Sequence, residues 1–91
     1  MKPQEIIDAL NARYARGEIQ IIRAGNPGAL RDTDPWEIAA PNGARWWRGH
    51  YYVANRLDGP FNLYFTEHNG LQVEHGTDRA ASLAAFLDAM R

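Results

Sequence analysis

The sequence contains no cysteine, which excludes disulfide bonds and thiolate metal sites. No apolar run suggests a signal peptide or a membrane span. Ser82 is the only serine, and no pattern pairs it with a base, while the loop residues Asp32, Asp34 and Asp58 have no recognisable catalytic partner. We therefore expect a cytoplasmic protein that is not an enzyme and needs no cofactor, metal or membrane.

Lysine is nearly absent, since Lys2 is the only one and the other nine basic residues are arginines. The formal net charge of −1 provides no global field that would attract nucleic acid or an anionic membrane. Arginine stacks on aromatic rings and pairs with carboxylates, which suits interfaces. A GC-rich genome would explain the same bias through its codons.

What is present fits a small folded domain. The chain has 91 residues, of which 45% are hydrophobic and 23% charged. This length predicts a single domain, 1–91, with a modest core. The sequence alone does not distinguish a monomer from a homodimer.

Helical spacing of apolar residues marks both ends of the chain. Pro3–Arg16 is predicted to be a helix that stops at Gly17, and a last helix begins after Thr77 or Asp78 and runs to about Met90. The apolar stripes are Ile6, Ile7, Leu10 and Tyr14 in the first helix, and Leu83, Phe86, Leu87 and Met90 in the last.

Five strands are expected between the helices, at Glu18–Ala24, Trp36–Pro41, Ala44–Arg56, from Phe61 to about Glu67, and from Leu71 to about His75. The connection Gly25–Pro35 is the one long loop. Asn42-Gly43 predicts a two-residue hairpin turn that pairs Ile38 with Trp47 and Glu37 with Arg48.

Three-residue loops are predicted for the next two hairpins. Asp58-Gly59-Pro60 would place Val53 opposite Phe65, and His68-Asn69-Gly70 would place Phe65 opposite Val73. A two-residue Asn-Gly turn in the last hairpin would pair Thr66 with Val73 instead.

These elements predict an α+β fold with an antiparallel five-stranded meander sheet and the N-terminal and C-terminal helices packed on one face, in the order αβββββα. The predicted register turns two sets of side chains to opposite faces. The face toward the helices would carry Trp36, Ile38, Trp47, Tyr51, Val53, Leu57, Phe61, Leu63, Phe65, Leu71 and Val73. The open face would carry Glu37, Trp46, Arg48, His50, Tyr52, Arg56, Tyr64, Thr66 and His68.

Aromatic residues interleaved with arginine on an open sheet face indicate a binding surface, because Trp, Tyr and Arg are enriched at interface hot spots. The candidate partner-binding residues are Trp46, Arg48, His50, Tyr52, Tyr64, Arg45 and Arg56. In the alternative interpretation, a helix or a second copy covers this face and Trp46 and Tyr52 belong to the core.

Three functional hypotheses follow. The first is a small non-enzymatic module that binds a protein through this face and the Gly25–Pro35 loop, comparable in size and style to phage or mobile-element inhibitors and adaptors such as anti-defence proteins. The second is a single-stranded RNA- or DNA-binding domain that stacks bases on the same face. The third is a metal protein in which His50 and His68 face each other across neighbouring strands, although further ligands are not evident.

Overall fold

The structure, a computed structural model, describes residues 2–23, 26–27, 36–51 and 61–90. Two helices enclose the strands along the chain. The elements are α1 (Pro3–Ala15), β1 (Gln20–Arg23), β2 (Asn26–Pro27), β3 (Trp36–Ala39), β4 (Arg45–Tyr51), β5 (Phe61–His68), β6 (Leu71–Glu74) and α2 (Arg79–Ala89).

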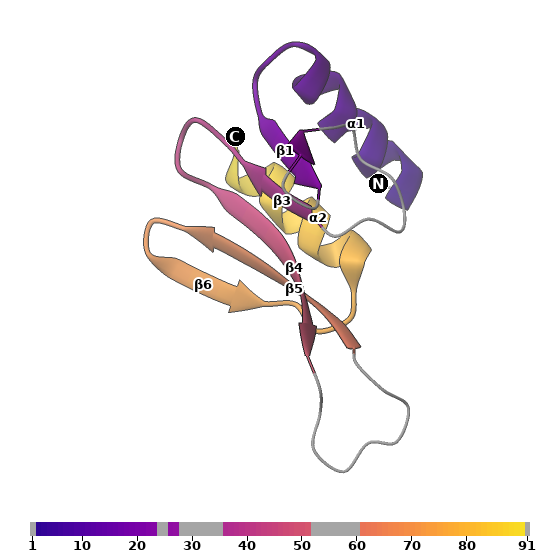
Figure 1. The fold of residues 1–91 in the computed structure, drawn as a ribbon, viewed down its shortest axis with the longest axis vertical. Coiled ribbons are helices and arrows are strands. Elements are labelled where there is room, and N and C mark those ends of the chain that lie inside the picture. The colour runs from indigo at the N-terminus through magenta and orange to yellow at the C-terminus, as the bar shows by residue number, and fades with distance from the viewer. Residues whose placement is uncertain (1, 24–25, 28–35, 52–60, 91) are drawn as a thin grey trace.

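The strands form one antiparallel sheet in the order β2-β1-β3-β4-β5-β6. Five of them are the predicted meander, with a helix before and a helix after it, so the predicted fold is confirmed. The two-residue strand β2 is an addition, which lies within the predicted long connection and borders β1. In Figure 1, α1 lies beside β1, and β6 lies on the side of the sheet away from α1. The helix α2 packs on β4 and β5.

The first helix begins and ends as its sequence predicts. Pro3 occupies the first helical turn, where a missing N–H costs nothing. At the other end, Gly17 has a φ of 74°, its N–H donates to the carbonyl of Tyr14 (3.0 Å), and the N–H of Glu18 donates to the carbonyl of Arg13 (2.9 Å). This pair of bonds is a Schellman motif, and it turns the chain toward β1.

The last helix is capped by Asp78, whose carboxylate accepts a hydrogen bond from the N–H of Ala81 at 3.0 Å. Its buried residues are Ser82, Leu83, Phe86 and Leu87. Three of these belong to the predicted apolar stripe, and Met90 is partly buried against the core.

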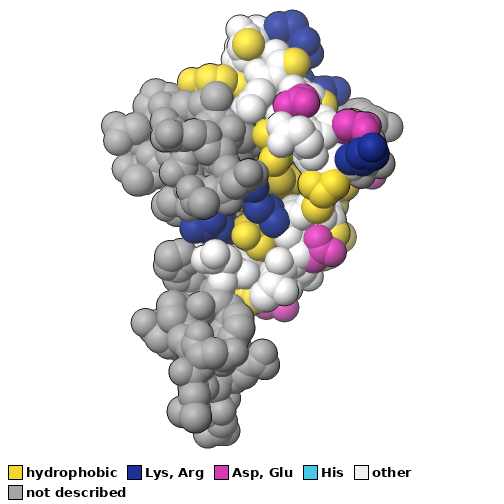
Figure 2. Space-filling model, turned by 90° about the vertical axis from the view of Figure 1, so that its right-hand side faces the viewer, with side chains coloured by type: hydrophobic (Ala, Val, Ile, Leu, Met, Phe, Trp, Pro, Cys, Tyr) yellow, Lys and Arg dark blue, Asp and Glu magenta, His cyan; other side chains and the backbone are white. Residues whose placement is uncertain are grey.

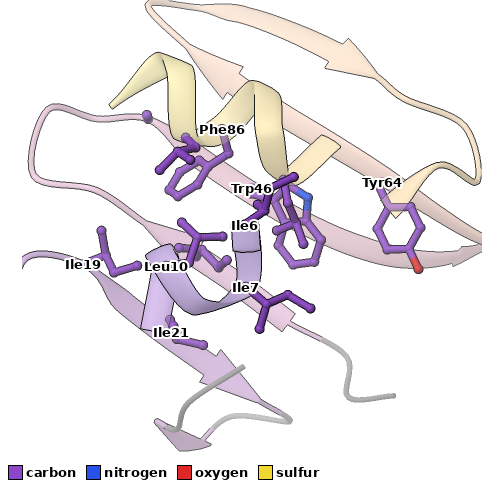
Figure 3. Close-up of a cluster of buried hydrophobic side chains, with 12 residues drawn as sticks. Ile6, Ile7, Leu10, Ile19, Ile21, Trp46, Tyr64 and Phe86 are labelled. Atoms are coloured by element: carbon purple, nitrogen blue, oxygen red, sulfur yellow. The ribbon is translucent and has the colours of Figure 1, made fainter. Parts of the chain in front are cut away.

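The core lies between one face of the sheet and both helices (Figure 3). Its members are Ile6, Ile7, Leu10, Ile19, Ile21, Ile38, Ala44, Trp46, Tyr64, Leu83, Phe86 and Leu87. Trp46 is fully buried and its ring lies 5.8 Å from that of Tyr64, which carries its hydroxyl toward the margin of the cluster. Trp46 is therefore the largest side chain in the centre of the fold.

The first hairpin has a register different from the prediction. Ile38 lies opposite Trp46 and Glu37 opposite Trp47, so the predicted pairs Ile38–Trp47 and Glu37–Arg48 are wrong by one residue. The turn is a three-residue loop closed between Ala40 and Ala44.

Proline explains this slip. A two-residue turn would make Pro41 and Ala44 a hydrogen-bonded pair, but Pro41 has no N–H to donate. The chain instead places Pro41 and Asn42 in the turn and Gly43 at a φ of 91°, with its N–H bonded to the carbonyl of Ala40 (3.1 Å). The side chain of Asn42 also accepts from the N–H of Ala44 at 3.0 Å.

The last hairpin has a shorter loop than predicted, whereas the first has a longer one. Its loop is the two-residue turn Asn69-Gly70, which pairs Thr66 with Val73 and leaves Phe65 opposite Glu74. Asn69 has a φ of 54° and Gly70 a φ of 80°, as a type I′ turn requires. Because asparagine tolerates the left-handed region, no third loop residue is needed.

The central hairpin also has a register different from the prediction. Trp47, not Val53, lies opposite Phe65, and Tyr51 opposite Phe61 is the last pair that the described residues form. The predicted turn at Asp58-Gly59-Pro60 falls outside the described residues. The shift is an even number of residues, so β4 and β5 keep the relative facing that the alternation of their side chains predicts.

Candidate binding surface

The register differs from the prediction by one residue in the first and in the last hairpin. The side chains of β4 and β5 therefore point to the opposite faces of the sheet from those predicted, relative to β3 and β6. The face away from the helices therefore contains residues that the sequence had placed in the core. Its described side chains are Gln20, Ile22, Glu37, Ala39, Arg45, Trp47, Leu63, Phe65, Glu67, Gln72 and Glu74. We call this set the outer face.

Arg45, Trp47 and Phe65 form a stack on the outer face. The rings of Trp47 and Phe65 lie 5.3 Å apart with an interplanar angle of 10°. The guanidinium carbon of Arg45 lies 5.3 Å from the centre of the Trp47 ring, within cation–π distance. Phe65 is only 8% exposed, whereas Trp47 is partly exposed and Arg45 is exposed. The stack thus offers a cation beside the ring of Trp47, and Phe65 packs against that ring.

Strand pairing places these groups together. Trp47 lies directly between Glu37 on β3 and Phe65 on β5, and Arg45 is two residues before Trp47 on the same face. Arg45 makes an ion pair with Glu37 through Nη2 and Oε1. Both of these charged side chains are close to half exposed, at 45% and 44%, so the ion pair lies in contact with solvent.

Two of the predicted binding residues belong to the core instead. Trp46 is 0% exposed and Tyr64 is 6% exposed, both on the face toward the helices. The prediction that they lie on an open face is wrong, because the registers of the first and the last hairpin each differ from the prediction by one residue. The alternative interpretation, with Trp46 in the core, is the correct one.

The remaining predicted binding residues have different outcomes. Arg45 is exposed on the outer face, whereas Arg48 is half-buried on the helix-side face, opposite Tyr64. His50 belongs to β4, but its side chain is outside what the structure describes. Tyr52 and Arg56 fall outside the described residues, as does most of the Gly25–Pro35 loop except Asn26 and Pro27.

The register also separates the two histidines of the metal hypothesis. His50 lies opposite Asn62 and His68 opposite Leu71, so their predicted juxtaposition is wrong. Nε2 of His75 lies 2.8 Å from Oγ1 of Thr66. Within the described segments, His, Asp and Glu do not gather in any group of three that could hold a metal ion.

Sequence reasoning placed Glu37 on the open face but missed Trp47 and Phe65, which it assigned to the face toward the helices. The signal that identifies them is Pro41, since its missing N–H excludes the two-residue turn and with it the register that buries Trp47. For the last hairpin, the Asn69-Gly70 dipeptide itself favours a two-residue type I′ turn.

A hollow of about 610 Å³ lies between the end of α1 and β1. Its described lining consists of Tyr14, Ala15, Gly17, Ile19, Gln20, Ile21 and Ile22. This lining includes no Asp, Glu, His, Lys or Arg, so it offers no acid–base pair. On the side of the molecule that Figure 2 shows, acidic, basic and apolar side chains of the described residues are interspersed.

No family model, curated protein or solved structure matches this chain. Neither of the two described helices is long and apolar enough to cross a membrane.

Proposed function

We propose that this domain is a non-enzymatic binding module that recognises another protein through its outer face. The observation that carries the proposal is the stack of Arg45 on Trp47 and of Trp47 on Phe65. Arginine and tryptophan are the side chains most often found at interface hot spots, where they combine apolar area with a fixed polar group. In this proposal Trp47 takes the central role that the sequence had given to Trp46.

The charges on the outer face favour a protein over a nucleic acid. Arg45 is already paired with Glu37, and Glu67 and Glu74 lie on the same face. Phosphate groups would meet carboxylates there, whereas a protein partner can place its own cations against them. The outer face therefore has aromatic rings on which bases could stack, but it lacks the excess of positive charge beside them that nucleic-acid binding requires.

The proposed mechanism is occlusion or tethering of the partner in the cytoplasm, as an inhibitor or adaptor of the phage or mobile-element type would act. Such a role needs no catalytic group. It needs a rigid scaffold that holds the contact residues in their binding conformation before the partner arrives. Such preorganisation reduces the entropy lost on binding. The pairing of Trp47 with both neighbouring strands supplies that rigidity.

The experiment begins with capture of partners from host lysate by the wild-type protein and by Trp47→Ala, with and without nuclease. The captured protein is then purified, and its affinity is measured by calorimetry at several salt concentrations. We expect Trp47→Ala to weaken binding by about 2 kcal/mol or more, as for a hot-spot residue, and Arg45→Ala to weaken it less. Circular dichroism must show that each variant is folded.

A matched control is Arg16→Ala, which also removes an exposed arginine from an ion pair, here with Glu18 in the turn between α1 and β1. It should leave the affinity unchanged. Equal affinity of wild type and Trp47→Ala for the partner would contradict the proposal. Capture that nuclease abolishes, with a steep loss of affinity in salt, would favour the nucleic-acid alternative.

A further inference from the structure

The strand β6 lies at the edge of the sheet, next to β5, and all four of its residues are exposed. Leu71 and Val73 are 68% and 39% exposed, and both lie on the helix-side face of the sheet. The helix α2 packs on β4 and β5. Exposed apolar residues on an edge strand are a feature that proteins usually avoid, since such an edge pairs readily with another strand.

The orientation of the β6 backbone follows from its last hydrogen bond to β5. The N–H of His75 donates to the carbonyl of Tyr64 at 2.8 Å, so the N–H of His75 points inward, toward β5. Because backbone groups alternate in direction along an antiparallel strand, those of Val73 and Leu71 also turn inward. The N–H and C=O groups of Gln72 and Glu74 therefore point away from the sheet, where a further strand would bind.

The opposite edge is protected in a way that β6 is not. There the sheet ends in β2, which consists of Asn26 and Pro27 only, and Pro27 has no N–H to offer. β6 has neither proline nor lysine. Of the two edges that the described strands form, β6 is the one able to accept a partner strand.

We propose that two copies of this protein form a symmetric dimer by antiparallel pairing of β6 with β6, around a two-fold axis at Val73. This inference concerns the edge of the sheet and is independent of the function proposed for the outer face. The axis places Val73 beside Val73 of the second copy. It also places Gln72 opposite Glu74 of the second copy, and Glu74 opposite Gln72 of the second copy.

Side-chain complementarity favours this register. Each Gln72 amide can donate a hydrogen bond to the Glu74 carboxylate across the strand pair, and the outward backbone groups of both residues are satisfied. An axis at Glu74 would bring two carboxylates together. An axis at Gln72 would place Glu74 opposite Gly70, which has a φ of 80° in the turn and is no longer extended.

Four residues from each copy form a small interface. Stable dimers commonly bury about 1,200–2,000 Å² in total, more than two such strands provide. We therefore expect a weak dimer that forms reversibly with rising concentration, and sedimentation equilibrium up to millimolar protein should detect it. A wild-type protein that remains monomeric over this whole range would overturn the proposal.

Charge substitutions test the register. Gln72→Glu places two carboxylates opposite each other at both ends of the strand pair, and it should weaken the dimer by about 2- to 30-fold. The double variant Gln72→Glu/Glu74→Lys restores opposite charges and should regain the wild-type affinity or exceed it. Gln20→Glu is the matched control, because Gln20 is an exposed glutamine of β1 that lies on the same face of the sheet as Gln72 but far from β6.

Equal weakening by Gln72→Glu and Gln20→Glu would overturn the proposal, and so would failure of the double variant to recover. A second measurement does not depend on charge. The chain has no cysteine, so Val73→Cys introduces a single thiol. Opposing residues in a non-hydrogen-bonded pair lie about 4.5 Å apart at Cα, close enough for a disulfide.

Mild oxidation should therefore cross-link Val73→Cys into a covalent dimer much faster than Gln20→Cys. Comparable cross-linking rates for the two variants would show that the contact is not at Val73 and would overturn the proposed register. All of these substitutions are at solvent-accessible positions, and circular dichroism verifies that each variant keeps its fold.

Discussion

The indole N–H of Trp46 donates a hydrogen bond to Oγ of Ser82, and the two atoms are 2.8 Å apart. This bond joins β4 to α2 in the centre of the core, where both residues are fully buried. Ser82 in turn donates to the carbonyl of Arg79 at 2.7 Å. The only serine of the chain thus provides a partner for the indole N–H of Trp46, the largest fully buried side chain among the described residues. This explains the place of Ser82 in an otherwise apolar helix face.

The adjacent tryptophans should differ sharply in their contribution to stability. Trp46→Ala opens a cavity in the core and should lower the free energy of unfolding by about 3–5 kcal/mol, which can unfold a domain of this size. Trp47→Ala removes a partly exposed ring and its stacking on Phe65, and should cost about 1–2 kcal/mol. Urea denaturation of both variants gives the comparison. Equal losses would contradict the assignment of the two faces.

The Trp46–Ser82 bond can be tested by a double-mutant cycle. Ser82→Ala leaves the buried indole N–H without a partner, so the free energy of unfolding should fall by about 1–3 kcal/mol. Trp46→Phe removes the same donor. In the double variant no donor remains unsatisfied, and the total loss should be smaller than the sum of the two single losses. Strictly additive losses would mean that the bond contributes nothing.

The order of helices and strands could be predicted because each element carries a local signal. Ile6, Ile7 and Leu10 repeat at helical spacing, and Pro3 and Gly17 mark the two ends of their helix. Residues Phe61–His68 alternate as a strand does. These signals involve neighbours in the chain, so one sequence suffices to read them.

The two faces of the sheet could not be assigned in the same way. Side chains alternate with a period of two, so a slip of one residue in a turn reverses a whole strand. Both sets of alternating residues in β4 contain a tryptophan, Trp46 or Trp47, and hydrophobicity alone does not decide between them. Turn chemistry at Pro41 and at Asn69 decides the register, and through it which side chains form the proposed binding surface.

The type I′ turn at Asn69-Gly70 predicts a specific asymmetry. Gly70 has a φ of 80°, and an added Cβ would meet no atom within 4 Å, so Gly70→Ala suffers backbone strain and no clash. We expect a loss of about 1–2 kcal/mol in the free energy of unfolding. Asn69→Gly adopts the same turn without strain and should change stability by less than about 0.5 kcal/mol. Thermal denaturation distinguishes them, and a neutral Gly70→Ala would argue against this turn.

Asn42 connects the first hairpin to the end of α2. Its Nδ2 donates to the carbonyl of Ala89 at 2.9 Å, while its Oδ1 accepts from the N–H of Ala44. Asn42→Asp keeps the acceptor but places a carboxylate beside a carbonyl at the negative end of the helix, and should cost about 1–2 kcal/mol at neutral pH. At low pH the protonated carboxyl can donate, so the loss relative to wild type should shrink. Denaturation at both pH values measures this, and an unchanged loss would contradict the bond to Ala89.

The pH dependence of Glu18 provides a test of the turn after α1. Arg16 donates from Nε to Oε1 at 2.9 Å and from Nη2 to Oε2 at 3.1 Å, and this hydrogen bonding holds the pKa of the Glu18 carboxyl below its usual value. A pKa that is lower in the folded state stabilises the fold above the ordinary glutamate pKa, and the contribution is lost as the pH falls through the lowered value. Both side chains are exposed, so the effect on stability is small and the titration itself is the better measurement.

Carboxyl ¹³C NMR should show the pKa of Glu18 rising toward its ordinary value in Arg16→Ala. The rise in Arg13→Ala should be smaller, since Arg13 acts only through its charge and is the weakest of the influences on this carboxyl. If Arg13→Ala raised the pKa of Glu18 as much as Arg16→Ala, the shift would come from the general positive charge at the end of α1. The bidentate contact between Arg16 and Glu18 would then not be its cause.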